Sequence, residues 1–178
     1  PLIVKLYYTA QLEKKIMTNL LSINKKIIRL LKFDLGLTHS EYIINKNGIY
    51  LVETSNRGAG VLGSTLILKE INNLNVSKYL IKTALGKKFN FKINKNNRFI
   101  CLKWFAFKSG KVKKVINHMN KKKYTLERKL LVKKNQKIKY PDSGANRHGF
   151  VIFKSNSFHQ MKKRLLEINN SVKIDYEK

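Results

Sequence analysis

The sequence predicts an α+β fold in which short antiparallel strand pairs pack against a few amphipathic helices. Apolar residues recur every three or four positions over Gln11–Phe33, which is the period of an amphipathic helix. By contrast, residues 38–54 form two runs rich in β-branched and aromatic residues around Lys46-Asn47-Gly48, the pattern of a β-hairpin. The length of 178 residues allows one domain with a real core, or two small ones.

The helix is preceded by an apolar strand, Leu2–Tyr8, and we expect Gly36 to end it in a left-handed conformation. Two helices follow the hairpin, at Thr65–Asn72 and Lys78–Leu85, with Ser64 and Ser77 as N-caps and Gly86 as the stop of the second. The remainder is predicted to be β-rich. Its expected elements are strands at Phe89–Ile93, Phe99–Phe107, Lys111–Ile116, Thr125–Val132, Lys137–Tyr140, Arg147–Lys154 and Val172–Ile174, and a helix at Phe158–Asn169 capped by Ser155 or Ser157. We therefore divide the chain into residues 1–86 and 87–178.

The register of the hairpin decides whether it carries a site. If Lys46–Gly48 are a three-residue loop, closed by a left-handed glycine, Glu41 lies directly opposite Glu53 with Cβ atoms about 5 Å apart. Two carboxylates in that position repel each other, so a shared proton or a divalent cation such as Mg²⁺ must offset the repulsion. A two-residue loop would instead turn the glutamates to opposite faces, where water would solvate them.

Other polar and small residues gather around this pair. His39 shares the glutamate face opposite Ser55, where it could assist a substrate or orient a carboxylate through a hydrogen bond. After Arg57, the segment Gly58-Ala59-Gly60 leaves backbone N–H groups open to a ligand, as glycines do in phosphate loops. A helix capped by Ser64 would aim its positive end at the same place.

These residues together resemble the metal-binding end of the ATP-grasp superfamily. The resemblance rests on Glu41, on Glu53 twelve residues later, and on Arg57 followed by the small residues 58–60. The segment Leu35–Glu41 is similar to the family's Gly-x-Thr-His-x-Glu lead-in. One departure is that the family's usual Asn, two residues after the second Glu, is Ser55 here, and Asn56 stands one position later.

The resemblance implies site residues and chemistry. The implied metal ligands are Glu41, Glu53, Ser55 and Asn56, and Arg57 would be catalytic, steadying an acyl-phosphate intermediate. Arg57, Gly58 and Gly60 would contact the phosphates of ATP. The implied cofactors are ATP and Mg²⁺ (or Mn²⁺), and the reaction would join a small carboxylate to an amine or ammonia, as in L-amino-acid ligases and carbamoyl-phosphate-synthase-like proteins.

The same resemblance predicts that the chain is incomplete as an enzyme. It shows no lysine on a preceding strand to grip ATP and no glycine-rich lid, which the family carries in its N-terminal half. We therefore expect the N-terminal half of the same enzyme as a partner and no activity from this chain alone. Whether the chain forms a homodimer is not decided by the sequence. A degenerate ATP-grasp remnant with a purely structural role is a further alternative for its function.

The net charge of +28 raises a rival interpretation, a basic non-catalytic module that binds nucleic acid or another polyanion. Only six of the 38 basic residues are Arg, and the lysines are spread along the chain apart from the run Lys121–Lys123. We therefore expect that nucleic-acid binding is not its purpose. Cys101 is the single cysteine, no signal peptide is visible and no run of eighteen apolar residues exists, so we expect a cytoplasmic location and no membrane span.

Arg147 and His148 follow a loop, 141–146, from which they could reach an active site. The alternative is an arginine at a strand edge that pairs with an acid or with solvent.

Overall fold

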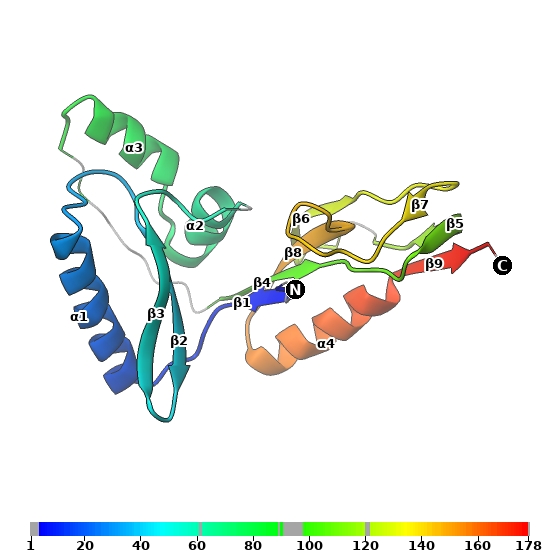
Figure 1. Ribbon diagram of the computed structural model, residues 1–178, viewed down its shortest axis with the longest axis horizontal. Coiled ribbons are helices and arrows are strands. Elements are labelled where there is room, and N and C mark those ends of the chain that lie inside the picture. The colour runs from blue at the N-terminus through cyan, green and yellow to red at the C-terminus, as the bar shows by residue number, and fades with distance from the viewer. Residues whose placement is uncertain (1–3, 61, 89, 91–97, 120–121, 178) are drawn as a thin grey trace. The chain divides into compact units, whose positions relative to one another are not determined.

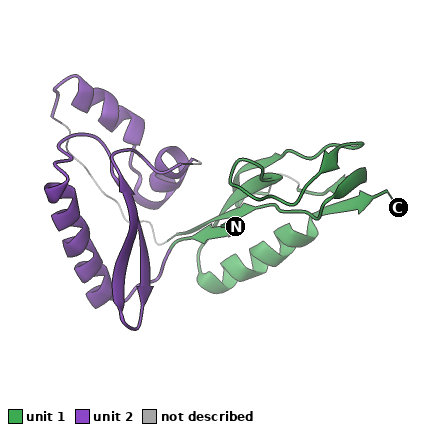
Figure 2. Cartoon of the chain, viewed as in Figure 1, with its two compact units in different colours: residues 1–9, 97–178 green, residues 10–96 purple. Residues whose placement is uncertain are grey.

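The computed structural model of the protein describes residues 4–60, 62–88, 90, 98–119 and 122–177. They form two compact units (Figure 2), residues 1–9 with 97–178 as unit 1 and residues 10–96 as unit 2. The division predicted from sequence placed the first strand with the hairpin. In the structure this strand, β1 (Leu6–Tyr8), pairs antiparallel with β4 (Phe99–Trp104) and so belongs to unit 1. The strand predicted at Phe89–Ile93 lies outside the described residues.

The described residues of unit 1 form two antiparallel sheets and one helix (Figure 1). The four-stranded sheet has the order β1-β4-β8-β6, and the three-stranded sheet has the order β7-β5-β9. The remaining strands are β5 (Gly110–Asn117), β6 (Thr125–Leu130), β7 (Lys137–Ile138), β8 (Gly149–Ser155) and β9 (Val172–Tyr176). Helix α4 (Phe158–Asn170) begins at Ser157, whose hydroxyl accepts a hydrogen bond from the Gln160 backbone N–H at 3.1 Å. One of the two predicted caps is thus confirmed.

The main core of unit 1 lies between the four-stranded sheet and α4. Central strands β4 and β8 are buried along most of their length, because they have a neighbour on each side and the helix on one face. Met161 and Ile168 lie seven residues apart, which is two helical turns, so both point into this core. The cluster consists of Cys101, Phe105, Val151, Phe153, Met161, Ile168 and Val172.

Unit 2 is built from α1 (Lys14–Leu30), the hairpin of β2 (His39–Asn45) and β3 (Gly48–Ser55), and three short helical segments. These are the π-helical turn η1 (Gly63–Ile67), α2 (Leu68–Asn72) and α3 (Val76–Ala84). The Tyr42 hydroxyl donates to the Asn24 side chain of α1 at 2.7 Å, which joins the helix to one face of the hairpin. Val76 is the single buried residue among the described residues of this unit.

Three predicted helix ends in unit 2 are wrong. Helix α1 ends at Leu30, and the left-handed residue that stops it is Lys32 and not Gly36: Lys32 adopts φ 52°, and Phe33 N–H donates to Ile28 O at 3.2 Å, which satisfies a carbonyl that the helix leaves free. Asn75, not Ser77, caps α3 by accepting from Lys78 N–H at 2.9 Å. The third wrong end is the Ser64 cap, because the Ser64 hydroxyl donates to Ala59 O at 3.2 Å instead.

Candidate metal centre

The hairpin brings Glu41 opposite Glu53 and His39 opposite Ser55, and both pairings confirm the sequence-based prediction. The loop between the strands is nevertheless shorter than predicted, because Asn45 pairs with Gly48. It consists of two residues, Lys46 and Asn47, and is stabilised where Asn47 N–H donates to the Asn45 side chain at 2.8 Å.

A β-bulge explains how a two-residue loop still places the glutamates together. Near the loop the pairs are Ile44 with Ile49, Ile43 with Tyr50 and Tyr42 with Leu51, so each partner in β3 is one residue earlier than a three-residue loop would give. The register then shifts between Tyr42 and Glu41, leaving Val52 as an extra residue in β3. Without that residue Glu41 would lie opposite Val52, and the two glutamates would point to opposite faces.

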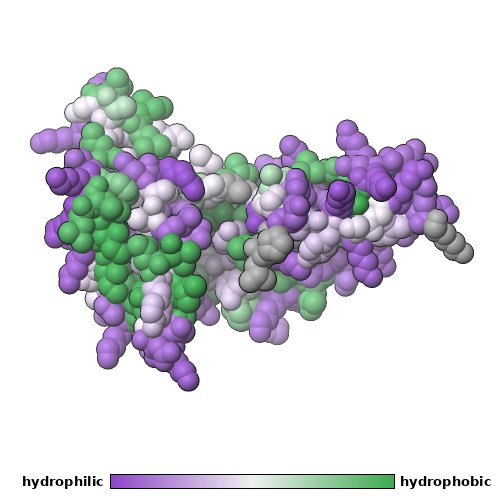
Figure 3. Space-filling model, in the orientation of Figure 1, coloured by the Kyte–Doolittle hydropathy of each residue, from purple (hydrophilic) through white to green (hydrophobic). Residues whose placement is uncertain are grey.

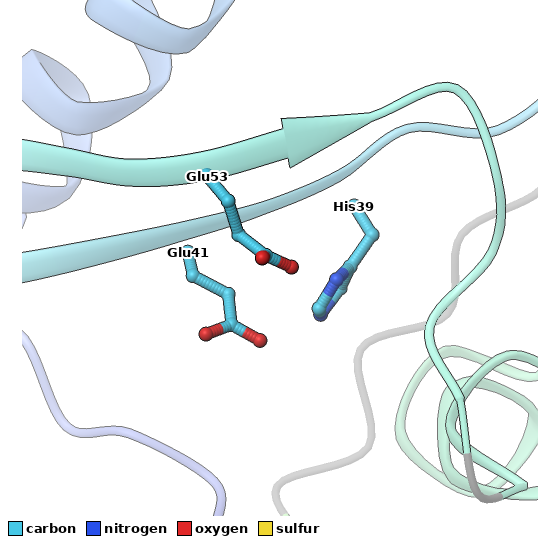
Figure 4. A group of neighbouring side chains, drawn as sticks. All are labelled: His39, Glu41 and Glu53. Atoms are coloured by element: carbon cyan, nitrogen blue, oxygen red, sulfur yellow. The ribbon is translucent and has the colours of Figure 1, made fainter.

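Three side chains converge on this face of the hairpin. His39, Glu41 and Glu53 each offer one ligand atom, and these atoms all lie within 4.8 Å of one another. Figure 4 shows the two carboxylates and the imidazole ring on the same side of the strands, pointing toward one another. Both glutamates are exposed and His39 is partly buried. The group therefore has the donor chemistry of a cation site, with carboxylate oxygens and an imidazole nitrogen.

Nothing within the part of the chain that the structure describes offsets the repulsion between the two carboxylates. Neither Glu41 nor Glu53 forms an ion pair with a described residue. The Nδ1 atom of His39 is shielded from solvent and has no hydrogen-bond partner among the described residues. A buried nitrogen without a partner costs free energy, so the described residues leave the imidazole ring unsatisfied. A divalent cation fits this donor set.

Ser55 and Asn56 contact other parts of the hairpin and its lead-in. The Ser55 hydroxyl donates to His39 O at 3.5 Å. In the amide orientation that satisfies its neighbours, the Asn56 nitrogen donates to Leu37 O at 3.1 Å and to Leu35 O at 3.2 Å. Asn56 therefore ties the segment before β2 to the segment after β3. The third group beside the two glutamates is His39, which a sequence spacing of two residues from Glu41 already places on that face.

The small-residue loop folds back onto η1. A Cβ atom on Gly58 would collide with the Ser64 hydroxyl, whereas one on Gly60 would meet nothing within 4 Å. Gly58 is thus needed for close packing, and Gly60 leaves its backbone open. The exposed Arg57 donates through Nη1 to Gly58 O at 3.0 Å. The Ser64-capped helix N-terminus that was predicted to face this loop is not formed. The first turn is instead the π-helical η1, for which Leu62 is the N-cap residue.

No family model and no curated protein matches the sequence, whereas many solved structures match its fold. An L-amino acid ligase from Bacillus licheniformis matches with a TM-score of 0.85 and 18% sequence identity, over 99% of this chain and 45% of the ligase. A phosphoribosylglycinamide synthetase from Anaerococcus prevotii matches with a TM-score of 0.79 and 21% identity, over 97% of this chain and 45% of the synthetase. These proteins are ATP-grasp enzymes.

The chain has an ATP-grasp fold. It corresponds to the C-terminal part of the ATP-grasp enzymes, and the predicted α+β class is confirmed. A third match is the biotin carboxylase domain of a 2-oxoglutarate carboxylase from Hydrogenobacter thermophilus, solved with MgADP, ADP and bicarbonate. Its TM-score is 0.68 at 13% identity, over 96% of this chain and 39% of that one. The chain thus spans less than half the length of these solved ATP-grasp proteins.

Arg147 and His148 serve packing within unit 1. The Arg147 guanidinium stacks over the Trp104 ring, 4.2 Å from its centre, and donates to Val4 O at 3.0 Å. His148 is 7% exposed; its Nδ1 accepts from Phe107 N–H at 2.9 Å, and its Nε2 lies 3.0 Å from Lys139 O. Since Nδ1 accepts, Nε2 carries the proton and donates to Lys139 O. No acid among the described residues pairs with Arg147, and its side chain is partly buried and not fully solvated.

This neutral histidine predicts a pH dependence of stability. Burial lowers the pKa of His148, although its bond to the Lys139 carbonyl acts in the opposite direction. The unfolded chain, with a histidine pKa of about 6.5, therefore takes up the proton first. The contribution of His148 is complete above that pH and is lost as the pH falls through the lower folded-state pKa.

We expect the free energy of unfolding of unit 1 to fall between pH 7.5 and pH 5 by more in the wild type than in His148→Gln. Urea titrations followed by the fluorescence of Trp104 measure this difference. His159→Gln is the matched control, because His159 is exposed on α4 and should keep the wild-type pH dependence. Equal slopes in all three proteins would contradict the assignment.

Proposed function

We propose that this chain is the metal- and phosphate-binding part of an ATP-dependent carboxylate–amine ligase. The observation that carries the proposal is the convergence of Glu41 and Glu53 with His39 on one face of a hairpin within an ATP-grasp fold. Two carboxylates held this close bind a divalent cation well, and such a cation supplies neutralisation of the phosphate charge of ATP when it is bound. Mg²⁺ or Mn²⁺ is the expected ion.

The proposed reaction has two steps. An oxygen of a small carboxylate attacks the γ-phosphorus of ATP, the bond to ADP breaks, and an acyl phosphate forms. An amine or ammonia then attacks the carbonyl carbon, the carbon–oxygen bond to phosphate breaks, and the nitrogen loses a proton, which leaves an amide and phosphate. Arg57 is exposed and free to turn from its neighbour's carbonyl toward the phosphoryl group, where its fixed charge would stabilise the developing negative charge.

The remaining part of the ATP site would come from the N-terminal half of the same enzyme. Ile43 and Tyr50 pair on the same face as the glutamates and are 57% and 50% exposed. Figure 3 shows apolar side chains gathered over the visible face of unit 2. Exposed apolar surface of this kind usually marks an interaction site. The solved ATP-grasp proteins are more than twice as long as this chain, which supports a covering half of the same enzyme.

The test uses hydroxylamine, a general trap for acyl phosphates, with MgATP and a panel of small carboxylates labelled with ¹⁸O. In a polypeptide that also carries the N-terminal half, we expect a hydroxamate from at least one carboxylate and one ¹⁸O atom in the released phosphate. Arg57→Ala should lower the rate by about 100-fold or more, the usual cost of losing one transition-state donor. The 178-residue chain alone should form no hydroxamate.

A different outcome would support the basic binding module. No hydroxamate from any carboxylate, together with polyanion binding that weakens steeply as salt rises, would contradict the ligase proposal. In the basic run 121–123, Lys122 already pairs with Glu167 at 3.2 Å, which reduces the charge that this run offers a polyanion.

A further inference from the structure

The contacts that the His39 side chain makes with the described residues do not explain why a histidine stands at this position of the hairpin. Its Nδ1 atom is shielded from solvent and has no hydrogen-bond partner among the described residues. Backbone pairing with Ser55, and the bond from the Ser55 hydroxyl to His39 O at 3.5 Å, position the residue at the start of β2. The side chain therefore lies beside Glu41 and Glu53, and its Nδ1 atom is left without a partner in the part of the chain that the structure describes.

We propose that His39 is the third protein ligand of the cation held by Glu41 and Glu53, and that it makes the site prefer Mn²⁺ or Co²⁺ over Mg²⁺. This inference rests on the proposed function, because it concerns the same cation. Two carboxylate oxygens alone suit Mg²⁺, whereas an imidazole nitrogen suits transition metals. A mixed set of two oxygens and one nitrogen moves the preference toward the transition metals.

The distances permit one shared ion. Ligand atoms on opposite sides of a cation lie about 4–5 Å apart when the bonds are about 2.0–2.6 Å long. The three groups lie within 4.8 Å of one another, so small side-chain rotations bring all of them to bonding distance. Both glutamates are exposed, which leaves them free to make that adjustment. Three protein ligands also leave other coordination positions for phosphate oxygens or water.

The position of the histidine separates this role from hydrogen bonding to a carboxylate. An imidazole that oriented Glu41 or Glu53 would lie within hydrogen-bond distance of one of their oxygens, and no such bond is formed among the described residues. An imidazole nitrogen that faces two carboxylates at this distance can share a cation with them.

The test measures metal binding and needs no catalysis. The purified protein is titrated with Mn²⁺, and the bound ion is examined by electron spin-echo spectroscopy, which detects a coordinated ¹⁴N nucleus. We expect ¹⁴N modulation in the wild type and its loss in His39→Gln. The same substitution should weaken Mn²⁺ and Co²⁺ binding by about tenfold or more and Mg²⁺ binding by less, as the loss of the one nitrogen ligand implies. His159→Gln, an exposed histidine elsewhere, should retain the modulation.

The outcomes distinguish this inference from the proposed function. If the wild type binds Mn²⁺ but shows no ¹⁴N modulation, His39 is not a ligand and the two-carboxylate site still stands. If the wild type binds no divalent cation at all, the proposed function fails with it. The wild-type spectrum decides the question even if His39→Gln does not fold, because it requires no variant.

Discussion

Replacing Glu53 with glutamine is expected to abolish divalent-cation binding at the hairpin and, without metal, to stabilise the fold. The two effects have the same origin. Glu41 and Glu53 lie directly opposite each other with no described cation beside them, so their charges repel. Opposed like charges on neighbouring strands cost about 0.2–1 kcal/mol, which Glu53→Gln would recover. The same substitution would remove one of the two carboxylate ligands, so the cation would no longer bind.

Thermal unfolding with and without Mn²⁺ measures both effects in one experiment. A ligand present at 100 times its dissociation constant stabilises the folded state by about 2.7 kcal/mol, because it binds the native protein and not the unfolded chain. We expect Mn²⁺ to raise the melting temperature of the wild type and to leave that of Glu53→Gln unchanged. Without metal, the variant should melt at a slightly higher temperature than the wild type.

The matched control is Glu13→Gln, a glutamate of the same unit that precedes α1 and makes no side-chain capping bond. It should respond to Mn²⁺ as the wild type does and should lose little stability. A Glu53→Gln protein that still gains stability with Mn²⁺ would show that the ion binds elsewhere. A variant less stable than the wild type in the absence of metal would show that the two carboxylates do not repel.

The second large effect is expected at the start of β8, where Gly149→Ala should destabilise unit 1 by about 3 kcal/mol or more. Gly149 has φ +135°, a conformation that L-residues with a side chain rarely adopt. It also pairs with Leu130 of β6, and a Cβ atom here would collide with the Lys129 carbonyl oxygen and lie 2.9 Å from the Leu130 Cα atom. Both neighbours are backbone atoms, so neither can rotate away.

Urea unfolding followed by Trp104 fluorescence measures this loss, since the single tryptophan is buried in the same sheet. Gly144→Ala is the control in the same unit. Its Cβ atom would come no closer than 3.4 Å, to the Arg147 side chain, and its backbone is not in the left-handed region. We expect a change within about 0.5 kcal/mol for the control. Similar values for the two variants would show that β8 and β6 move apart easily.

Features that depend on a few neighbouring residues could be predicted from the sequence. The periodicity of α1 and the β-branched runs around Lys46–Gly48 are local signals, and they indicated the helix and the hairpin correctly. The opposition of Glu41 and Glu53 was also predicted, as was the place of His39 on their face. The helix, the strands and the place of His39 follow from the period of a helix or a strand, whereas the glutamate pair was predicted from a three-residue loop that the structure does not form.

The bulge at Val52 could not be predicted, because a two-residue loop plus one extra residue produces the same glutamate pair as a three-residue loop without a bulge. Only the strand pairing in the folded hairpin distinguishes them, because Tyr42 pairs with Leu51 and not with Val52. The pairing of β1 with β4 joins segments more than ninety residues apart, and no local pattern encodes such a contact. That the Nδ1 atom of His39 is buried without a hydrogen-bond partner among the described residues likewise depends on what surrounds the ring, so only the tertiary structure shows it.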